Sequence, residues 1–537
     1  MSRIRHRSRR AALLLLLGSW AGALAACGGA RGILNEQDPF AWATLRPDQW
    51  IEVRDGPLTI YSNAPPARVR ELVADLSLLR AVVARLTDLI TANERPSARV
   101  FVFASPLGFR HFQPTPTTAA YFVSLPQGST IVTTAGLPGS ARVRNRVMWM
   151  SGFSQEEALQ RLYHEYVHLS LRGVRPLIYP PWYDEGIAEL FSTVRLRDGV
   201  VQVGAVPSRP NPLPLSATDL LTVRAYQDFS AERIDSFYAQ SRGLVHMLVG
   251  GHRIGLPDRR AALTRYLELV NEGVAEREAC RLAFGVEPDR LGEELAAFLE
   301  GERVPQWHLD PSLLETTTAD AERRLSIGES LALLGELAAE VLGIESETAG
   351  RLLRAAAERD PENATVLAWL ALRSGVDGRL AETGDYLARV EAAGGGPGAD
   401  RVVARLLLHR ATESGATESG ARGALVERAL LRLRRSLEAE PGSIESLALL
   451  GNAYVLSDRD PTPGIEALER VRVAVPSSTA VHLVLAELYR RAGRWEPARE
   501  SVDRVLQWSG SPAELDAART LSAAIAVRSS GPLPAVR

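Results

Sequence analysis

Two histidines and a glutamate stand at a spacing suited to binding one metal ion. Residues 162–169 read LYHEYVHL and contain His164, Glu165 and His168. On a helix, His164 and His168 lie one turn apart on the same face, so both imidazoles can reach one cation. Glu165 points beside that face, where its carboxylate can polarise a water molecule without being a ligand. The pattern predicts a zinc site that hydrolyses its substrate.

A zinc ion with two histidine ligands needs a third hard ligand and keeps a fourth position for water. Residues 180–191, PPWYDEGIAELF, begin a new helix after a proline turn and place Glu185 17 residues beyond His168. A second helix that returns antiparallel to the first must provide its ligand at such a spacing. The chain has only two cysteines, Cys27 and Cys280, which cannot build a Cys-rich zinc site. Any metal must therefore use histidine and carboxylate ligands.

HExxH followed by W-x-x-E-G-x-A-E resembles the gluzincin metallopeptidases, in particular the peptidase MA-like group related to the M1 aminopeptidases. The resemblance covers residues 50–300 and is specific around residues 160–195. In that family the glutamate before the glycine is the third zinc ligand, which implies this role for Glu185. The resemblance implies one Zn²⁺ per chain, held by His164, His168 and Glu185, with Glu165 as the general base.

Two further residues have candidate roles near the metal. Glu189 lies one helical turn beyond Glu185 and is either a hydrogen-bond partner of a ligand histidine or a solvated charge. Residues 237–245, FYAQSRGLV, resemble the family's Y-x-x-[GS] helix, whose tyrosine hydroxyl binds the developing oxyanion. Tyr238 is the candidate for that role, and the alternative is a packed core tyrosine.

The sequence also departs from the M1 pattern. The interval from histidine to glutamate is two residues shorter, and no G-x-M-E-N sequence precedes the zinc helix. The site that anchors the free amine of an aminopeptidase substrate is therefore not recognisable. Aminopeptidase activity cannot be carried over, and endopeptidase action on a peptide or protein fits better.

The composition excludes several other chemistries. The chain has 537 residues and 62 basic side chains, all of them arginine. Without lysine there is no Walker A loop, no pyridoxal Schiff base and no Ser–Lys dyad. The net charge of −2 also argues against a broad nucleic-acid-binding face.

The first residues are typical of an exported lipoprotein. Five arginines within residues 1–10 precede an apolar run over residues 11–26, which is too short for a comfortable membrane span. The run ends Leu24-Ala-Ala-Cys27-Gly28, which resembles the bacterial lipobox. The resemblance implies cleavage before Cys27, a lipid on its sulfur and sorting to the periplasmic face of the outer membrane. The alternative is an ordinary secretory signal with a chance cysteine. The export route, general secretion or twin-arginine, stays open.

The hydrophobic pattern predicts an α+β protein that is mainly helical. Short strands and a long amphipathic helix over residues 67–90 precede the metal motif. By analogy with the gluzincin fold, residues 130–133 are expected as a strand that forms the upper edge of the cleft and binds substrate as an added strand. The other histidines, among them His246 and His482, lack partners at ligand spacing, and Cys280 is expected to be a small buried thiol.

After residue 307 the helical period continues throughout and repeats emerge. In the clearest unit, Leu485, Ala486 and Tyr489 are followed by Ala498 and Val502, which are tetratricopeptide-repeat offsets. Generic amphipathic helices are the alternative. The expected organisation is a signal peptide, a lipid-anchored linker, a thermolysin-like gluzincin domain and a tetratricopeptide-like repeat domain, over residues 1–26, 27–49, 50–305 and 320–527.

These observations predict a membrane-anchored zinc peptidase whose repeats bind substrates or a protein partner, with no nucleic acid involved. Two alternatives remain from the sequence. One is a non-catalytic periplasmic scaffold that acts through its helical repeats, and the other is an enzyme that hydrolyses a different amide, such as a cell-wall peptide stem.

Overall fold

The computed structural model describes most of the chain after residue 39. The described residues are 40–56, 58–87, 98–114, 118, 120–125, 128–136, 155–172, 177–205, 215–224, 226, 229–301, 303–316, 321–413 and 419–529. The expected signal peptide and Cys27 lie outside them. Among the described helices, none is long and apolar enough to cross a membrane. The chain is mainly helical with a mixed β-sheet, which confirms the expected class.

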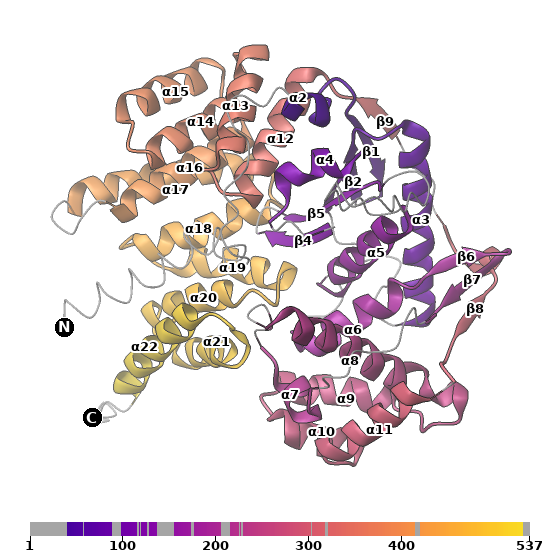
Figure 1. Ribbon diagram of the computed structural model, residues 1–537. Coiled ribbons are helices and arrows are strands. Elements are labelled where there is room, and N and C mark those ends of the chain that lie inside the picture. Colours follow the sequence, from indigo (N-terminus) through magenta and orange to yellow (C-terminus); the bar gives the residue numbers. More distant parts are fainter. Residues whose placement is uncertain are drawn as a thin grey trace, which may run out of the picture.

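A six-stranded sheet lies in the upper half of the N-terminal part as Figure 1 shows it. Its strand order is β4-β5-β3-β2-β1-β9, with β2, β3 and β5 parallel and the other pairs antiparallel. The strands are β1 (Ile51–Asp55), β2 (Leu58–Ser62), β3 (Ala98–Phe103), β4 (Ala120–Leu125), β5 (Gly128–Thr134) and β9 (Ala321–Arg324).

Alternation along the strands gives the sheet two apolar faces. Val100 and Val102 of β3 pack into a core with the buried face of α3 (Pro66–Leu86). Phe101 and Phe103, which point the other way, pack into a second core with Trp50 and the C-terminal helices. The sheet therefore lies between the long helix α3 on one face and the C-terminal helices on the other.

The edge of the sheet differs from the expectation for residues 130–133. These residues lie in β5, which is hydrogen-bonded to β3 on one side and β4 on the other. The strand at this edge is β4, and it contacts α5 (Gln155–Arg172), the helix of the metal motif. The expectation was wrong because the β4–β5 hairpin folds β4 outward and buries β5.

The rest of the N-terminal part is helical with a small antiparallel sheet, β6-β7-β8. Cys280 is buried, as expected. The additional elements up to residue 313 are α2 (Phe40–Leu45), α4 (Pro106–Phe109), α6 (Pro181–Phe191), β6 (Arg195–Arg197), β7 (Val200–Val203), α7 (Ala217–Thr222), α8 (Ala231–Gly250), α9 (Arg260–Asn271), α10 (Glu276–Phe284), α11 (Pro288–Glu300), β8 (Trp307–Leu309) and the short 3₁₀ turns η1 (Arg110–Phe112), η2 (Gly251–Ile254) and η3 (Pro311–Leu313).

The C-terminal part is a stack of helices that pack mainly as successive pairs. Glycine allows close approach within the pairs; for example, a Cβ on Gly335 would overlap Leu353, and one on Gly451 would overlap Leu468. The helices are α12 (Ile327–Val341), α13 (Glu347–Arg359), α14 (Ala364–Val376), α15 (Leu380–Ala392), α16 (Pro397–Glu413), α17 (Ser419–Ala439), α18 (Ile444–Leu456), α19 (Thr462–Ala474), α20 (Thr479–Arg491), α21 (Trp495–Trp508) and α22 (Pro512–Ser529).

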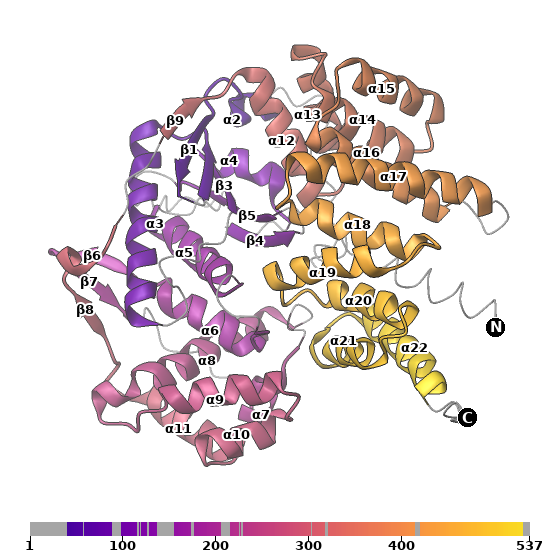
Figure 2. The ribbon, with the colours of Figure 1, turned by 180° about the vertical axis from the view of Figure 1, so that it is seen from behind.

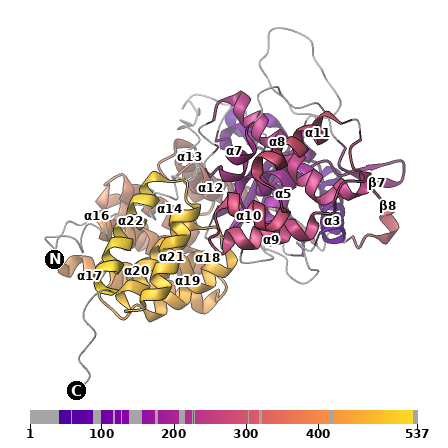
Figure 3. The same cartoon turned by 90° about the horizontal axis from the view of Figure 1, so that it is seen from below.

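The two parts lie side by side and touch at both ends of the helical stack (Figures 1, 2 and 3). At one end, β9 pairs with β1, and Arg99 of β3 forms an ion pair with buried Glu340 of α12 at 2.6 Å. At the other end, Trp508 of α21 packs into the core of the N-terminal part. The strand β9 thus lies inside the span expected for repeats but belongs to the N-terminal sheet, because its backbone completes that edge.

Candidate metal centre

The helix α5 carries the two motif histidines on its buried side. His164 and His168 are 5% and 6% exposed. The neighbouring apolar residues Leu162, Val167 and Leu169 are buried as well, so the helix is fixed in the core. Both imidazoles consequently face the interior of the N-terminal part.

The helix α6 brings Glu185 back toward α5. It begins at Pro181, whose fixed φ suits the first turn of a helix, and it buries Trp182 and Ile187. A Cβ on Gly186 would overlap the backbone oxygen of Ser241 in α8, so only glycine lets the two helices approach this closely. This contact explains the glycine that follows Glu185.

Three donor atoms converge between α5 and α6. The Nε2 atoms of His164 and His168 are 3.0 Å apart. The Oε2 atom of Glu185 lies 3.1 Å from Nε2 of His164 and 3.5 Å from Nε2 of His168. Among the described residues, this is the one group of three or more histidine, cysteine or carboxylate side chains found close enough to share an ion.

The opposite nitrogen of each imidazole faces a carboxylate. Nδ1 of His168 hydrogen-bonds Oδ1 of Asp184 at 2.9 Å. Nδ1 of His164 lies 3.1 Å from Oε1 of Glu189, at hydrogen-bond length although poorly aligned. A proton on each Nδ1 leaves each Nε2 with a bare lone pair. The three converging atoms are then all acceptors, and a cation is what such an arrangement suits.

The spacing fits tetrahedral zinc. Ligand atoms at 2.0–2.1 Å from a tetrahedral centre are about 3.3–3.4 Å apart. The three separations in this site, 3.0, 3.1 and 3.5 Å, lie on either side of that value. Two imidazole nitrogens and one carboxylate oxygen are also a ligand set that zinc takes in hydrolytic enzymes.

The electrostatic environment favours positive charge. Burial lowers the pKa of His164, but its contacts with Glu185 and Glu189 outweigh burial and raise that pKa to about 9. Burial alone would raise the pKa of Glu185, yet the two histidines bring it well below its usual value. Both shifts express one property: the carboxylates around these imidazoles stabilise a positive charge placed among them.

Glu165, beside the histidines, is affected differently. Burial raises its pKa, and the neighbouring His164 and His168 counteract this only in part. A carboxylate whose pKa is moved toward neutrality accepts and returns a proton more readily than one with an ordinary pKa. Glu165 is therefore a buried carboxylate that can accept a proton beside the two histidines.

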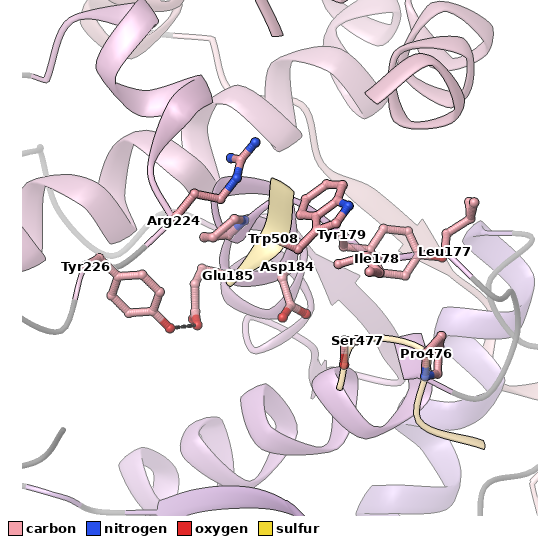
Figure 4. Close-up of a pocket in the computed structure, with 11 residues that line it drawn as sticks. Leu177, Ile178, Tyr179, Asp184, Glu185, Arg224, Tyr226, Pro476, Ser477 and Trp508 are labelled. Atoms are coloured by element: carbon pink, nitrogen blue, oxygen red, sulfur yellow. Dashed lines mark hydrogen bonds between the residues drawn. The ribbon is translucent and has the colours of Figure 1, made fainter. Parts of the chain in front are cut away.

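Two tyrosines lie on the far side of the cluster. The hydroxyl of Tyr226 donates to Oε1 of Glu185 at 2.5 Å (Figure 4). The other carboxylate oxygen, Oε2, faces Nε2 of His164. The ring of Tyr238, half-buried on α8, lies 6.1 Å from the ring of His164 between centroids. Burial and nearby carboxylates raise its pKa well above the usual value, so its hydroxyl stays protonated and can donate.

The structure thus brings together His164, Glu165, His168, Glu185 and Glu189, with Tyr238 alongside. Sequence reasoning missed Asp184 and Tyr226. Asp184 adjoins Glu185 and carried a usable signal, because histidine ligands commonly pair with a carboxylate. Tyr226 belongs to no recognisable motif, and only the fold places it near Glu185.

A cavity of about 310 Å³ adjoins the cluster (Figure 4). Asp184 and Glu185 form part of its wall. The remaining wall comes from the segment before α6 and its first residue, from Arg224 and Tyr226, and from the C-terminal part. It comprises Leu177, Ile178, Tyr179, Pro181, Arg224, Tyr226, Pro476, Ser477 and Trp508.

Comparison with known proteins adds no assignment: no family model matches the chain, and no curated protein matches it significantly.

Proposed function

We propose that the chain is a zinc-dependent peptidase of the gluzincin type, most simply an endopeptidase. The observation that carries this is the convergence of three lone-pair donors, from His164, His168 and Glu185, at tetrahedral spacing with Glu165 beside them. A structural zinc site would be closed by four protein ligands, whereas three leave a position for substrate or water.

The chain's own residues account for the remaining steps. A bound Zn²⁺ would polarise the scissile carbonyl and acidify a water molecule. Glu165 removes a proton from the attacking water, whose oxygen bonds to the carbonyl carbon. The C–N bond then breaks, and Glu165 returns the proton to the leaving amine. Tyr238 donates a hydrogen bond to the developing oxyanion.

The edge of the sheet that β4 forms offers a place for the peptide backbone. On this side β4 is the last of the described strands, and it pairs with β5, so a substrate could add there as a further strand. The contact between β4 and α5 puts this edge beside the metal motif. We propose that the substrate binds there in extended form.

The rest of the proposal concerns the other parts of the chain. The helical pairs from α12 to α22 support a tetratricopeptide-like repeat domain that binds substrates or a protein partner. The lipobox at Cys27 supports a lipid anchor on the periplasmic face of the outer membrane.

The test combines metal content with cleavage. The purified full chain should carry about one zinc per molecule and cleave peptides in a degradome assay. The Glu165→Gln variant should keep its zinc and lose cleavage at least a hundredfold, because the proton acceptor is gone. The Glu157→Gln variant, which changes an exposed carboxylate of the same helix, is the control. A chain that cannot be loaded with zinc, or a Glu165→Gln variant that cleaves normally, would refute the proposal.

A further inference from the structure

The cavity beside the metal cluster is built from both parts of the molecule. Asp184 and Glu185 contribute one wall from α6. Pro476 and Ser477, in the connection between α19 and α20, and Trp508, at the end of α21, contribute another (Figure 4). The C-terminal helices therefore reach the immediate surroundings of a proposed metal ligand.

The wall from α21 is held in place by hydrogen bonds to the N-terminal part. Gln507 donates through Nε2 to the backbone oxygen of Val270, and Arg504 donates to Oδ1 of Asn271 at 3.2 Å. The same Asn271 side chain bonds the backbone N and O of Ile178, at 2.9 and 2.8 Å. Because Ile178 also lines the cavity, α21 and the opposite wall are connected through one buried asparagine.

Charged groups in the wall already have partners. Arg224 forms an ion pair with Glu276, and its Nε donates to the backbone oxygen of Gln507 at 3.0 Å. Asp184 bonds His168, and Glu185 accepts from Tyr226. A charged group entering the cavity would therefore lose water without gaining a free counter-charge, which is unfavourable. An uncharged group carries no such penalty.

The remaining wall includes aromatic and aliphatic side chains, among them Leu177, Ile178 and Trp508. Trp508 lies at the cavity with its indole under the guanidinium of Arg224, 5.0 Å from the ring centroid, so its orientation is fixed. Its indole N–H is buried and has no hydrogen-bond partner among the described residues. The volume of about 310 Å³ is about twice that of a cavity of ~150 Å³ that holds benzene.

We propose that this cavity receives one large uncharged side chain of the substrate, that of a residue next to the scissile bond, and that Trp508 selects for it. The inference rests on the proposed peptidase function. It makes the last helices of the chain part of the substrate pocket, in addition to any partner they bind.

The test uses three hydroxamates that share one metal-binding head group. Acetohydroxamate has no side chain to place in the cavity, 3-phenylpropionohydroxamate carries a ring, and 6-aminohexanohydroxamate carries a charge. Their dissociation constants for the zinc-loaded full chain are measured by calorimetry. The phenyl compound should bind at least tenfold more tightly than acetohydroxamate, and the amino compound no more tightly.

Three variants test whether the tighter binding of the phenyl compound depends on this cavity. Trp508→Ala should reduce the advantage of the phenyl compound to less than threefold, and Ser477→Phe, which fills the cavity, should do the same without removing a core side chain. Acetohydroxamate should bind both variants as it binds the wild type. Trp495→Ala, at the other end of α21, should keep the full preference.

The outcomes separate the two proposals. If acetohydroxamate binds but the phenyl compound binds no better, or if Trp508→Ala and Ser477→Phe keep the preference, the pocket assignment is wrong and the metal site stands. If 6-aminohexanohydroxamate binds more tightly than acetohydroxamate, the proposal that the cavity takes an uncharged side chain is also wrong. If the chain holds no zinc, both proposals fail.

Discussion

At the scale of single residues, the position of each imidazole depends on the carboxylate behind it. Asp184 accepts from Nδ1 of His168, and Glu189 faces Nδ1 of His164. These contacts select the tautomer whose Nε2 can bind a metal. The carboxylates also hold the rings in orientation, so metal affinity should respond to residues that never touch the ion.

Replacing Asp184 tests this dependence. We expect Asp184→Ala to lower zinc affinity about 10–100-fold, because His168 loses the partner that fixes its ring. Asp184→Asn keeps a side-chain oxygen acceptor, so its zinc affinity should fall by less than that of Asp184→Ala. Competition with a chelator of known affinity measures both. Unchanged affinity in Asp184→Ala would show that the contact does not orient the ligand.

The two tyrosines should separate metal binding from catalysis. Tyr226→Phe removes the hydroxyl bonded to Glu185, so zinc affinity should fall. Tyr238→Phe should leave zinc affinity unchanged and reduce kcat about 10²–10³-fold, because an oxyanion donor is lost. Metal titration and steady-state kinetics on one peptide distinguish these effects. Equal behaviour of the two variants would contradict the assigned roles.

Some residues of the candidate site could be predicted from the sequence and others could not, for physical reasons. His164, Glu165 and His168 share one helix, so their geometry follows from its period. Glu185 required a second helix to return at the correct distance, and the family resemblance supplied that expectation. Tyr226 needed the packing of a separate segment against α6, which spacing along the chain does not encode.

At the scale of elements, the close crossing of α6 and α8 determines how near α6 places Glu185 to the two histidines. Gly186 lies against the backbone of Ser241, and a methyl group there has no space. We expect Gly186→Ala to destabilise the protein by about 1–3 kcal/mol and to weaken zinc binding as α6 shifts. Thermal unfolding and zinc titration measure the two effects.

Gly384→Ala is the matched control for this variant. Gly384 is also helical, in α15, but a Cβ there would meet no atom within 4 Å. The substitution should be neutral or stabilise by about 0.5–1 kcal/mol through helix propensity. If Gly186→Ala were equally harmless, the close helix crossing would not control the site.

Element prediction succeeded where side-chain periodicity is strong. The helix expected over residues 67–90 is observed as Pro66–Leu86, and residues 88–90 lie outside the described part of the chain. The order of strands was harder, because β4 and β5 alternate similarly and only the hairpin decides which lies outside. The role of β9 in the sheet was not foreseen, since its sequence Ala-Glu-Arg-Arg has no apolar alternation.

At the scale of the whole molecule, one buried histidine in each part makes stability depend on pH. His246 of α8 bonds the backbone oxygen of Pro305, and His482 lies buried in α20. Burial lowers the pKa of each to about 4, against about 6.5 in an unfolded chain. Between these values the unfolded chain binds more protons, so stability is full above pH 6.5 and falls toward pH 4.

The expected loss is about 3 kcal/mol for each histidine across that window. Thermal unfolding between pH 4 and pH 7 measures it. In a His246→Phe/His482→Leu double variant the slope over this range should be smaller than in the wild type. An unchanged slope would assign the acid sensitivity to other groups.

The attachment of α21 to the N-terminal part also determines when the cavity can be completed during synthesis of the chain. The bond from Arg224 to Gln507 joins residues 283 positions apart, so it closes only when almost the whole chain has been made. A chain that stops before α21 contains His164, His168 and Glu185 but has no Trp508 beside them. The three residues of the proposed metal site are therefore present in the growing chain well before the cavity next to them acquires its final wall.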